Sequence, residues 1–364
     1  MARKKVALIL GGGGARAAYQ IGVLEAWKDI FERGASLEIL IGVSAGAINA
    51  VGMMQFAPDF ATGLEAVKRL WCTITPNDIF ESKVRSVTHN LMRLVSSSRH
   101  VGNGQNNDIA NAILSTAPLR SYLAGHIDME KVHHGLSSLP GHGLAVNCFD
   151  YSYKKNITFF ETLETCAEWE RPSTRGMRAT LTLEHIMASC AAPLIFPPVL
   201  MDGNYYGDGS LRNITPLQSA VRMGADRIIN ISLSGDQFQH EPHVVPTLGR
   251  IASTLFDGMF LDALDVDSEF MRRVNVLTES IPEGQRNTRN IELCRVAPMI
   301  DFSLIASHYR HRFPRTLRYL YGGWISQDML SYLLFDGEYA KELMEYGRKD
   351  GERFRDQIEG WLRE

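Results

Sequence analysis

Short apolar runs alternate with longer stretches of helical spacing along the first 235 residues of the chain. The runs Val6–Leu10 and Leu37–Gly42 end in glycine and are typical of strands buried on both faces. From Ala15 to Phe31 apolar residues recur every three or four positions, which predicts a helix, and Ala45–Met54 predicts a second one. Strands that alternate with helices favour an α/β fold with a largely parallel sheet.

The same alternation continues to about residue 240. We predict further strands at Leu144–Phe149, Ile157–Phe160 and Asp226–Leu233, a hairpin around Asp202-Gly203-Asn204, and helices at Leu183–Cys190 and from Thr215-Pro216 to Met223. Segments 96–107 and 279–290 are predicted to be exposed loops. Because strand signals fade after residue 240, we expect an α/β domain over 5–235 and a mostly helical region over 236–364.

Composition excludes several classes of protein. The 364 residues are 45% apolar, which is enough for a sizeable core, and carry a formal net charge of −3. This balance disfavours a nucleic-acid partner that would need a basic field. Five cysteines without a CxxC pair disfavour a disulfide framework or a zinc site and indicate a reducing, cytoplasmic compartment. No run approaches the roughly 18 apolar residues of a membrane span, and we expect no metal or cofactor.

Four consecutive glycines, Gly11 to Gly14, join the first strand to the first helix. Such a loop presents bare N–H groups beside a helix N-terminus, where negative charge is favoured. Gly12, Gly14 and Ala17 loosely match a dinucleotide fingerprint, but the second strand lacks the acidic residue that would bind a ribose. By itself the loop leaves phosphate binding and oxyanion binding open.

A second motif, Gly42-Val43-Ser44-Ala45-Gly46, lies between a strand and a helix. This is the context of a nucleophile elbow, in which Gly42 and Gly46 avoid collisions in a sharp turn and Ser44 is exposed. The alternative is a serine that caps the helix. Because Ser44 follows only the second strand, an ordinary α/β-hydrolase with a Ser–acid–His order is disfavoured. Asp208, between two glycines at a strand end, is a candidate base or else a turn aspartate.

Four sequence blocks occur in a fixed order: the glycine loop, the motif around Ser44, the segment Ala188–Pro198, and Asp208-Gly209 followed by Asn213 and Pro216. In this order they resemble the patatin-like phospholipase family over about residues 5–235. The resemblance implies a three-layer αβα fold and a Ser–Asp dyad, with Ser44 as nucleophile and Asp208 as general base. It implies an oxyanion hole from the backbone of Gly12, Gly13 and Gly14, with Arg16 at the basic position of that loop. Two departures are Ala17, where glycine is usual, and Ser210, where glycine or alanine is usual.

The activity that the resemblance implies is hydrolysis of lipid acyl esters, of phospholipase A or lysophospholipase type, through an acyl-enzyme. The alternatives are a generic carboxylesterase, a phosphate- or nucleotide-binding regulator, and a lipid-binding protein without hydrolytic activity. Residues 308–325 interleave four arginines with aromatic residues and contain no acidic residue. This favours peripheral contact with the inner membrane surface; the alternative is a helix with core aromatics and solvated arginines.

Overall fold

The computed structural model describes residues 4–81, 112–139, 141–212, 216–235, 248–260, 263–282, 289–321 and 326–363. The loop predicted at 96–107 lies outside these residues, as do Asn213, Thr215 and Trp324. The loop predicted at 279–290 overlaps the end of a helix at Glu279, and its residues 283–288 also lie outside.

Strands between residues 6 and 296 form one sheet with the order β10-β9-β1-β2-β3-β4-β6-β5, and β8 pairs with β3 and β7. Their bounds are β1 Val6–Leu10, β2 Ile39–Val43, β3 Gly143–Asp150, β4 Lys155–Thr162, β5 Trp169–Glu170, β6 Thr174–Arg178, β7 Val199–Met201, β8 Asn204–Asp208, β9 Arg227–Ile231 and β10 Glu292–Val296. The five strands from β10 to β3 are parallel. The predicted α/β fold with a mostly parallel sheet is therefore confirmed.

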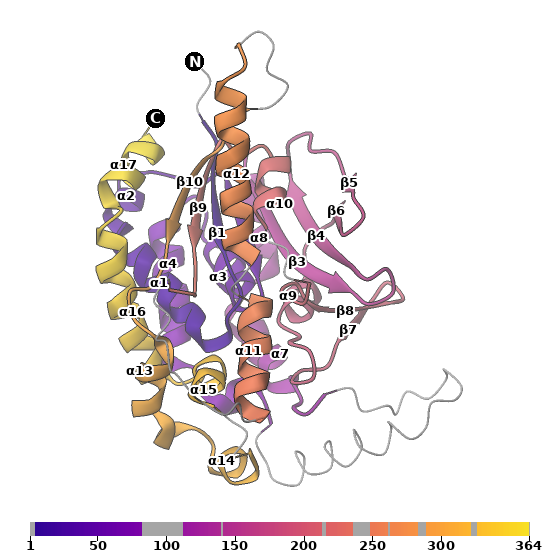
Figure 1. Cartoon of the computed structure of the whole chain (residues 1–364), viewed down its shortest axis with the longest axis vertical. Coiled ribbons are helices and arrows are strands. Elements are labelled where there is room, and N and C mark those ends of the chain that lie inside the picture. The colour runs from indigo at the N-terminus through magenta and orange to yellow at the C-terminus, as the bar shows by residue number, and fades with distance from the viewer. Residues whose placement is uncertain are drawn as a thin grey trace.

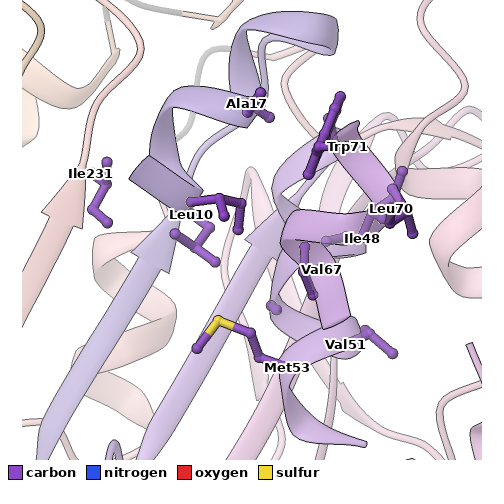
Figure 2. Close-up of a cluster of buried hydrophobic side chains, with 14 of the residues drawn as sticks. Leu10, Ala17, Ile48, Val51, Met53, Val67, Leu70, Trp71 and Ile231 are labelled. Carbon is purple, nitrogen blue, oxygen red and sulfur yellow. The ribbon is translucent and has the colours of Figure 1, made fainter. Parts of the chain in front are cut away.

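Both faces of this sheet are covered, which explains the unbroken apolar runs of its central strands. Along β1, Val6, Leu8 and Leu10 belong to the larger hydrophobic cluster, whereas Ala7 and Ile9 belong to a second cluster on the opposite face. Figure 2 shows part of the larger cluster, to which β1 contributes Leu10 and two helices, Ala45–Met54 and Phe60–Thr73, contribute side chains such as Ile48 and Leu70. Helices on both faces of the sheet make the three layers.

The helices described before residue 235 are α1 Ala18–Glu25, α2 Lys28–Glu32, α3 Ala45–Met54, α4 Phe60–Thr73, α5 Pro76–Ile79, α7 Ala117–His126, α8 Met129–Ser137, α9 Leu183–Ser189 and α10 Leu217–Arg222, with a 3-10 helix η1 at Gly14–Ala17. The single helix predicted from Ala15 to Phe31 is wrong: the chain forms η1, α1 and α2 instead. Between α1 and α2, Trp27 leaves the helical conformation while its indole N–H donates to the Gly351 carbonyl.

The predicted hairpin is confirmed as β7 and β8. Its two turn residues, Asp202 and Gly203, both have positive φ, as a tight turn between twisted strands requires. A strand that the sequence did not predict, β10, lies in the C-terminal region and extends the sheet beside β9. Its alternation is short and includes the charged Glu292 and Arg295, which conceals the apolar pattern.

Helices dominate the remainder of the chain: α11 Leu248–Phe260, α12 Ala263–Glu279, α13 Phe302–His308, η3 Arg310–Arg312, α14 Arg315–Tyr321, α15 Gln327–Leu333, α16 Gly337–Glu352 and α17 Arg355–Arg363. Helix α16 lies alongside α1 (Figure 1). A side chain at Gly22 or Gly347 would overlap the backbone of the facing helix, so the two helices approach closely. Across the described ranges, no helix has both the length and the apolar character needed to cross a membrane.

Candidate active site

Ser44 lies at a sharp turn between β2 and α3. Its backbone has φ 53° and ψ −129°, a conformation that costs a non-glycine residue free energy and is typical of a functional turn. A side chain at Gly42 would overlap Ala47, and one at Gly46 would overlap the Leu10 carbonyl. Both glycines of the motif are thus required by close backbone approach. The Ser44 hydroxyl does not cap α3, which removes the alternative interpretation as a helix cap. The prediction that Ser44 is exposed is wrong: the residue is 5% exposed, because neighbouring elements pack around the turn, and it lines a pocket instead.

The turn is held by a residue that sequence reasoning missed, Ser189 at the end of α9. Its hydroxyl accepts a hydrogen bond from the Ser44 N–H at 2.8 Å and donates one to the Asn147 carbonyl at 2.7 Å. Ser189 is completely buried. One hydroxyl therefore connects the elbow, α9 and β3. Its place in the Ala188–Pro198 block was the available signal, but nothing local in that block points to residue 44.

Asp208 ends β8, which pairs with β3 through Cys148, and this pairing brings the carboxyl group to Ser44 across 164 positions of sequence. The side chain is fully buried, with the thiols of Cys148 and Cys190 nearby. Burial destabilises the charged carboxylate and raises the pKa of Asp208 to about 6, although hydrogen bonding from Ser44 and Ser210 opposes the shift.

The two carboxylate oxygens of Asp208 have different surroundings. Oδ1 accepts a hydrogen bond from the Ser210 N–H at 2.9 Å, and the Ser210 hydroxyl also lowers the pKa of Asp208. Within the described residues, Oδ2 accepts no hydrogen bond of normal geometry, so the Ser44 contact is long or poorly aligned. Catalytic hydrogen bonds often have this character before a substrate is bound.

The glycine loop lies against the C-terminal helices. Gly14 has φ 56°, and a side chain there would overlap the Tyr332 carbonyl of α15. Among the described residues, none of the N–H groups of Gly12, Gly13 and Gly14 donates a hydrogen bond to a backbone or side-chain acceptor. Gly14 and Ser44 line one pocket. Three amides without an acceptor among the described residues therefore lie in a loop whose end borders the pocket that Ser44 lines.

Arg16 directly follows this loop and is 5% exposed. Its guanidinium donates to the Ser331 hydroxyl at 2.7 Å and lies 3.6 Å from Asp257 Oδ1. The ring of Tyr332 stacks under it, 3.7 Å from the guanidinium carbon to the ring centre. Nearby Tyr332 and Asp257 raise the pKa of Arg16 despite its burial. These contacts direct the side chain towards α11 and α15.

The pocket beside Ser44 is almost wholly apolar. It lies between α3, α4, α5, α7, α11, α15 and the segment 190–196. The empty space there is about 650 Å³ when open solvent is included, and the centre of a water-sized sphere can occupy about 50 Å³ of it. Ile48, Trp71 and Leu123 line one side, and Phe256 and Tyr332 line the side formed by the C-terminal helices. Such a surface fits a hydrocarbon chain and offers little to a charged nucleotide.

A scan of protein families finds the model of "Patatin-like phospholipase" matching residues 8–221, more than half of the chain. The chain belongs to the patatin-like phospholipase family. The α/β fold with a mostly parallel sheet agrees with this membership. Membership implies lipid acyl hydrolysis in general. A search of curated proteins found no significant match.

Two solved structures are distant neighbours of this family member, each 13% identical in sequence. VipD from Legionella pneumophila matches with a TM-score of 0.34 over 94% of this chain and 67% of its own. Human GIVD cytosolic phospholipase A2, solved with methyl γ-linolenyl fluorophosphonate and terbium chloride, matches with a TM-score of 0.44 over 99% of this chain. The chain spans 59% of the length of that phospholipase.

Residues 308–319, in the described part of the segment 308–325, combine features of both predicted alternatives. Phe313 is in the core, whereas Tyr319 is 90% exposed. Arg310, Arg312 and Arg315 are exposed as well, and Arg312 lies 3.2 Å from the Asp336 carboxylate.

All five cysteines of the chain are free thiols. Over the described ranges, no three His, Cys, Asp or Glu side chains group as a metal site would require.

Proposed function

We propose that the protein hydrolyses acyl esters of phospholipids or lysophospholipids through a Ser44–Asp208 dyad. The observation that carries this proposal is the combination of a strained Ser44, a buried Asp208 with a pKa of about 6, and one apolar pocket at the nucleophile. A carboxylate of that pKa is mostly ionised at neutral pH, yet is a stronger base than an exposed aspartate.

In the proposed acylation, Asp208 takes the proton of the Ser44 hydroxyl as Oγ attacks the ester carbonyl carbon. The tetrahedral intermediate collapses, and the alcohol of the lipid leaves with the proton that Asp208 returns. Water then attacks the acyl-Ser44 ester while Asp208 accepts its proton, which releases the fatty acid and restores the serine. The pocket holds the acyl chain throughout, because burying apolar chain against apolar side chains is favourable.

The proposed oxyanion hole consists of the N–H groups of Gly12, Gly13 and Gly14, which have no acceptor among the described residues. A single well-placed donor contributes about 2.7–4 kcal/mol to the transition state. With an aspartate alone as base, these amides carry much of the rate enhancement. For Arg16, the C-terminal contacts of the guanidinium support a role in fixing the loop.

The deciding experiment is covalent labelling with a long-chain fluorophosphonate, followed by mass mapping of the adduct. We expect one adduct, on Ser44, and none in Ser44→Ala. Asp208→Asn should fold and label far more slowly, because the base is absent. Folded wild-type protein that gains no adduct would refute the dyad. Hydrolysis restricted to short soluble esters would favour the generic carboxylesterase instead.

We further propose that the exposed arginines and Tyr319 contact an anionic membrane surface, on the cytoplasmic side. Exposed basic and aromatic side chains suit the headgroup layer. Flotation with liposomes containing anionic lipid should recover the wild type and lose Tyr319→Ala combined with Arg315→Glu. Equal recovery of the wild type with and without anionic lipid would reject this contact.

We also propose that the chain is divided into a catalytic domain over residues 5–235 and a mostly helical region over residues 236–364.

A further inference from the structure

A buried positive charge beside the glycine loop has its partners in the C-terminal helices. Arg16 is the second residue after Gly14 and is almost fully buried, and a buried guanidinium needs a carboxylate or dipoles around it. The hydroxyl of Ser331 and the ring of Tyr332 come from α15, and the carboxylate of Asp257 comes from α11. These residues all lie outside the segment that matches the family, 8–221.

Asp257 contacts both Arg16 and Tyr332. Its Oδ1 lies 3.6 Å from the Arg16 guanidinium and accepts a hydrogen bond from the Tyr332 hydroxyl at 2.7 Å. Tyr332 in turn presses its own carbonyl against Gly14, with no room for a side chain there. Asp257 is thus connected to the glycine loop through two residues. Arg16 directly follows the loop, and the Tyr332 carbonyl lies against Gly14.

The helix that carries Asp257 also closes the pocket. Phe256, the preceding residue, lines the same cavity as Ser44 and Gly14 and lies 6.4 Å from the Tyr332 ring, centre to centre. Helices α11 and α15 lie side by side (Figure 1). Helix α15 also contacts η1. Helix α11 therefore contributes Phe256 to the lining of the pocket beside Ser44 and Asp257 to the contacts of Arg16.

We propose that Asp257 is a positioning residue, which holds the amides of Gly12, Gly13 and Gly14 in place by fixing Arg16 and Tyr332. This inference rests on the proposed function and extends it, because it makes α11 and α15 part of the catalytic apparatus. Asp257 itself is not among the residues that line the pocket beside Ser44. Its removal leaves the Arg16 charge buried with a weakened counter-charge, and the loop loses its fixed geometry.

The test compares Asp257→Asn with Asp257→Glu, which keeps the charge, and with the control Glu269→Gln. Glu269 pairs with Arg272 and Arg273, whose side chains are exposed on α12, so the control breaks ion pairs away from the site. Hydrolysis of p-nitrophenyl butyrate is measured per site titrated with fluorophosphonate. We expect kcat per site to fall at least about tenfold in Asp257→Asn, since one oxyanion donor is worth 10²–10³ in kcat. KM should change less, and Asp257→Glu should recover part of the rate.

A variant that is merely less stable has fewer titratable sites but an unchanged kcat per site, so that outcome would overturn the proposal. Hydrogen exchange adds a readout that does not need activity. The peptide that covers residues 8–20 should exchange faster in Asp257→Asn than in the wild type or in Glu269→Gln. Unchanged exchange also overturns the proposal. Wild-type protein that neither labels nor hydrolyses esters would refute the dyad, and the exchange experiment would still decide the role of Asp257.

Discussion

Replacing Asp208 with asparagine should make the folded protein more stable at neutral pH while abolishing hydrolysis. The carboxylate is fully buried, and its pKa is raised to about 6 mainly by burial. An amide of the same shape carries no charge, and its oxygen can still accept the Ser210 N–H bond. The folded state then no longer holds a desolvated anion.

The magnitude follows from the difference between the folded and unfolded pKa values of Asp208. A shift from 3.8 to about 6 corresponds to about 3 kcal/mol at pH 8, where the carboxylate is ionised in both states. The sign is destabilising, because the folded state binds the proton more tightly than the unfolded chain does. The penalty falls to about 1 kcal/mol at pH 4.5 and vanishes below the unfolded pKa.

Urea unfolding of the wild type and Asp208→Asn, from pH 4.5 to pH 8, measures this difference directly. Groups that titrate identically in the two proteins cancel, so the stability gained by the variant should grow by about 2 kcal/mol over that range. The unfolding slope should be unchanged. A gain that does not increase with pH, or a variant less stable at pH 8, would show that the carboxylate is not held in a charge-excluding site.

Four further outcomes follow from the same contacts. The kcat/KM of the wild type should rise with pH through an apparent pKa of about 6; Ser210→Ala removes a donor to Asp208, so its acid limb should move to higher pH. A limb near pH 4 in both proteins would contradict the base assignment. Ser189→Ala should lower the free energy of unfolding by about 1–3 kcal/mol, measured in urea, because a buried N–H loses its acceptor. Gly46→Ala should lower it by about 3 kcal/mol or more, since the added carbon overlaps the backbone. Gly125→Ala, which has open space around it, should instead raise the melting temperature slightly, and an equal effect of the two alanines would undermine the close-packing argument.

Local patterns predicted the parts of the molecule that depend on neighbours in sequence. The apolar runs of β1 and β2, the hairpin at Asp202-Gly203 and the strand–turn–helix around Ser44 each follow from contacts within a few residues. The helix from Ala15 to Phe31 was wrong because Trp27 is held by Gly351, a residue more than 300 positions away. β10 was missed because its pattern is too short to distinguish from a loop without its neighbour β9.

The sequence alone identified Ser44 as the residue of a sharp turn, because a serine between two nearby glycines, at the junction of a strand and a helix, is typical of a nucleophile elbow. It singled out Asp208, and the family resemblance implied that Asp208 pairs with Ser44. The local pattern could not show how the two residues come together, that burial raises the pKa of Asp208, or that Ser189 and Asp257 take part. Those features depend on β8 pairing with β3 and on α9, α11 and α15 packing around the elbow. Burial and distance between residues far apart in the chain are properties of the assembled core, and only the tertiary structure decides them.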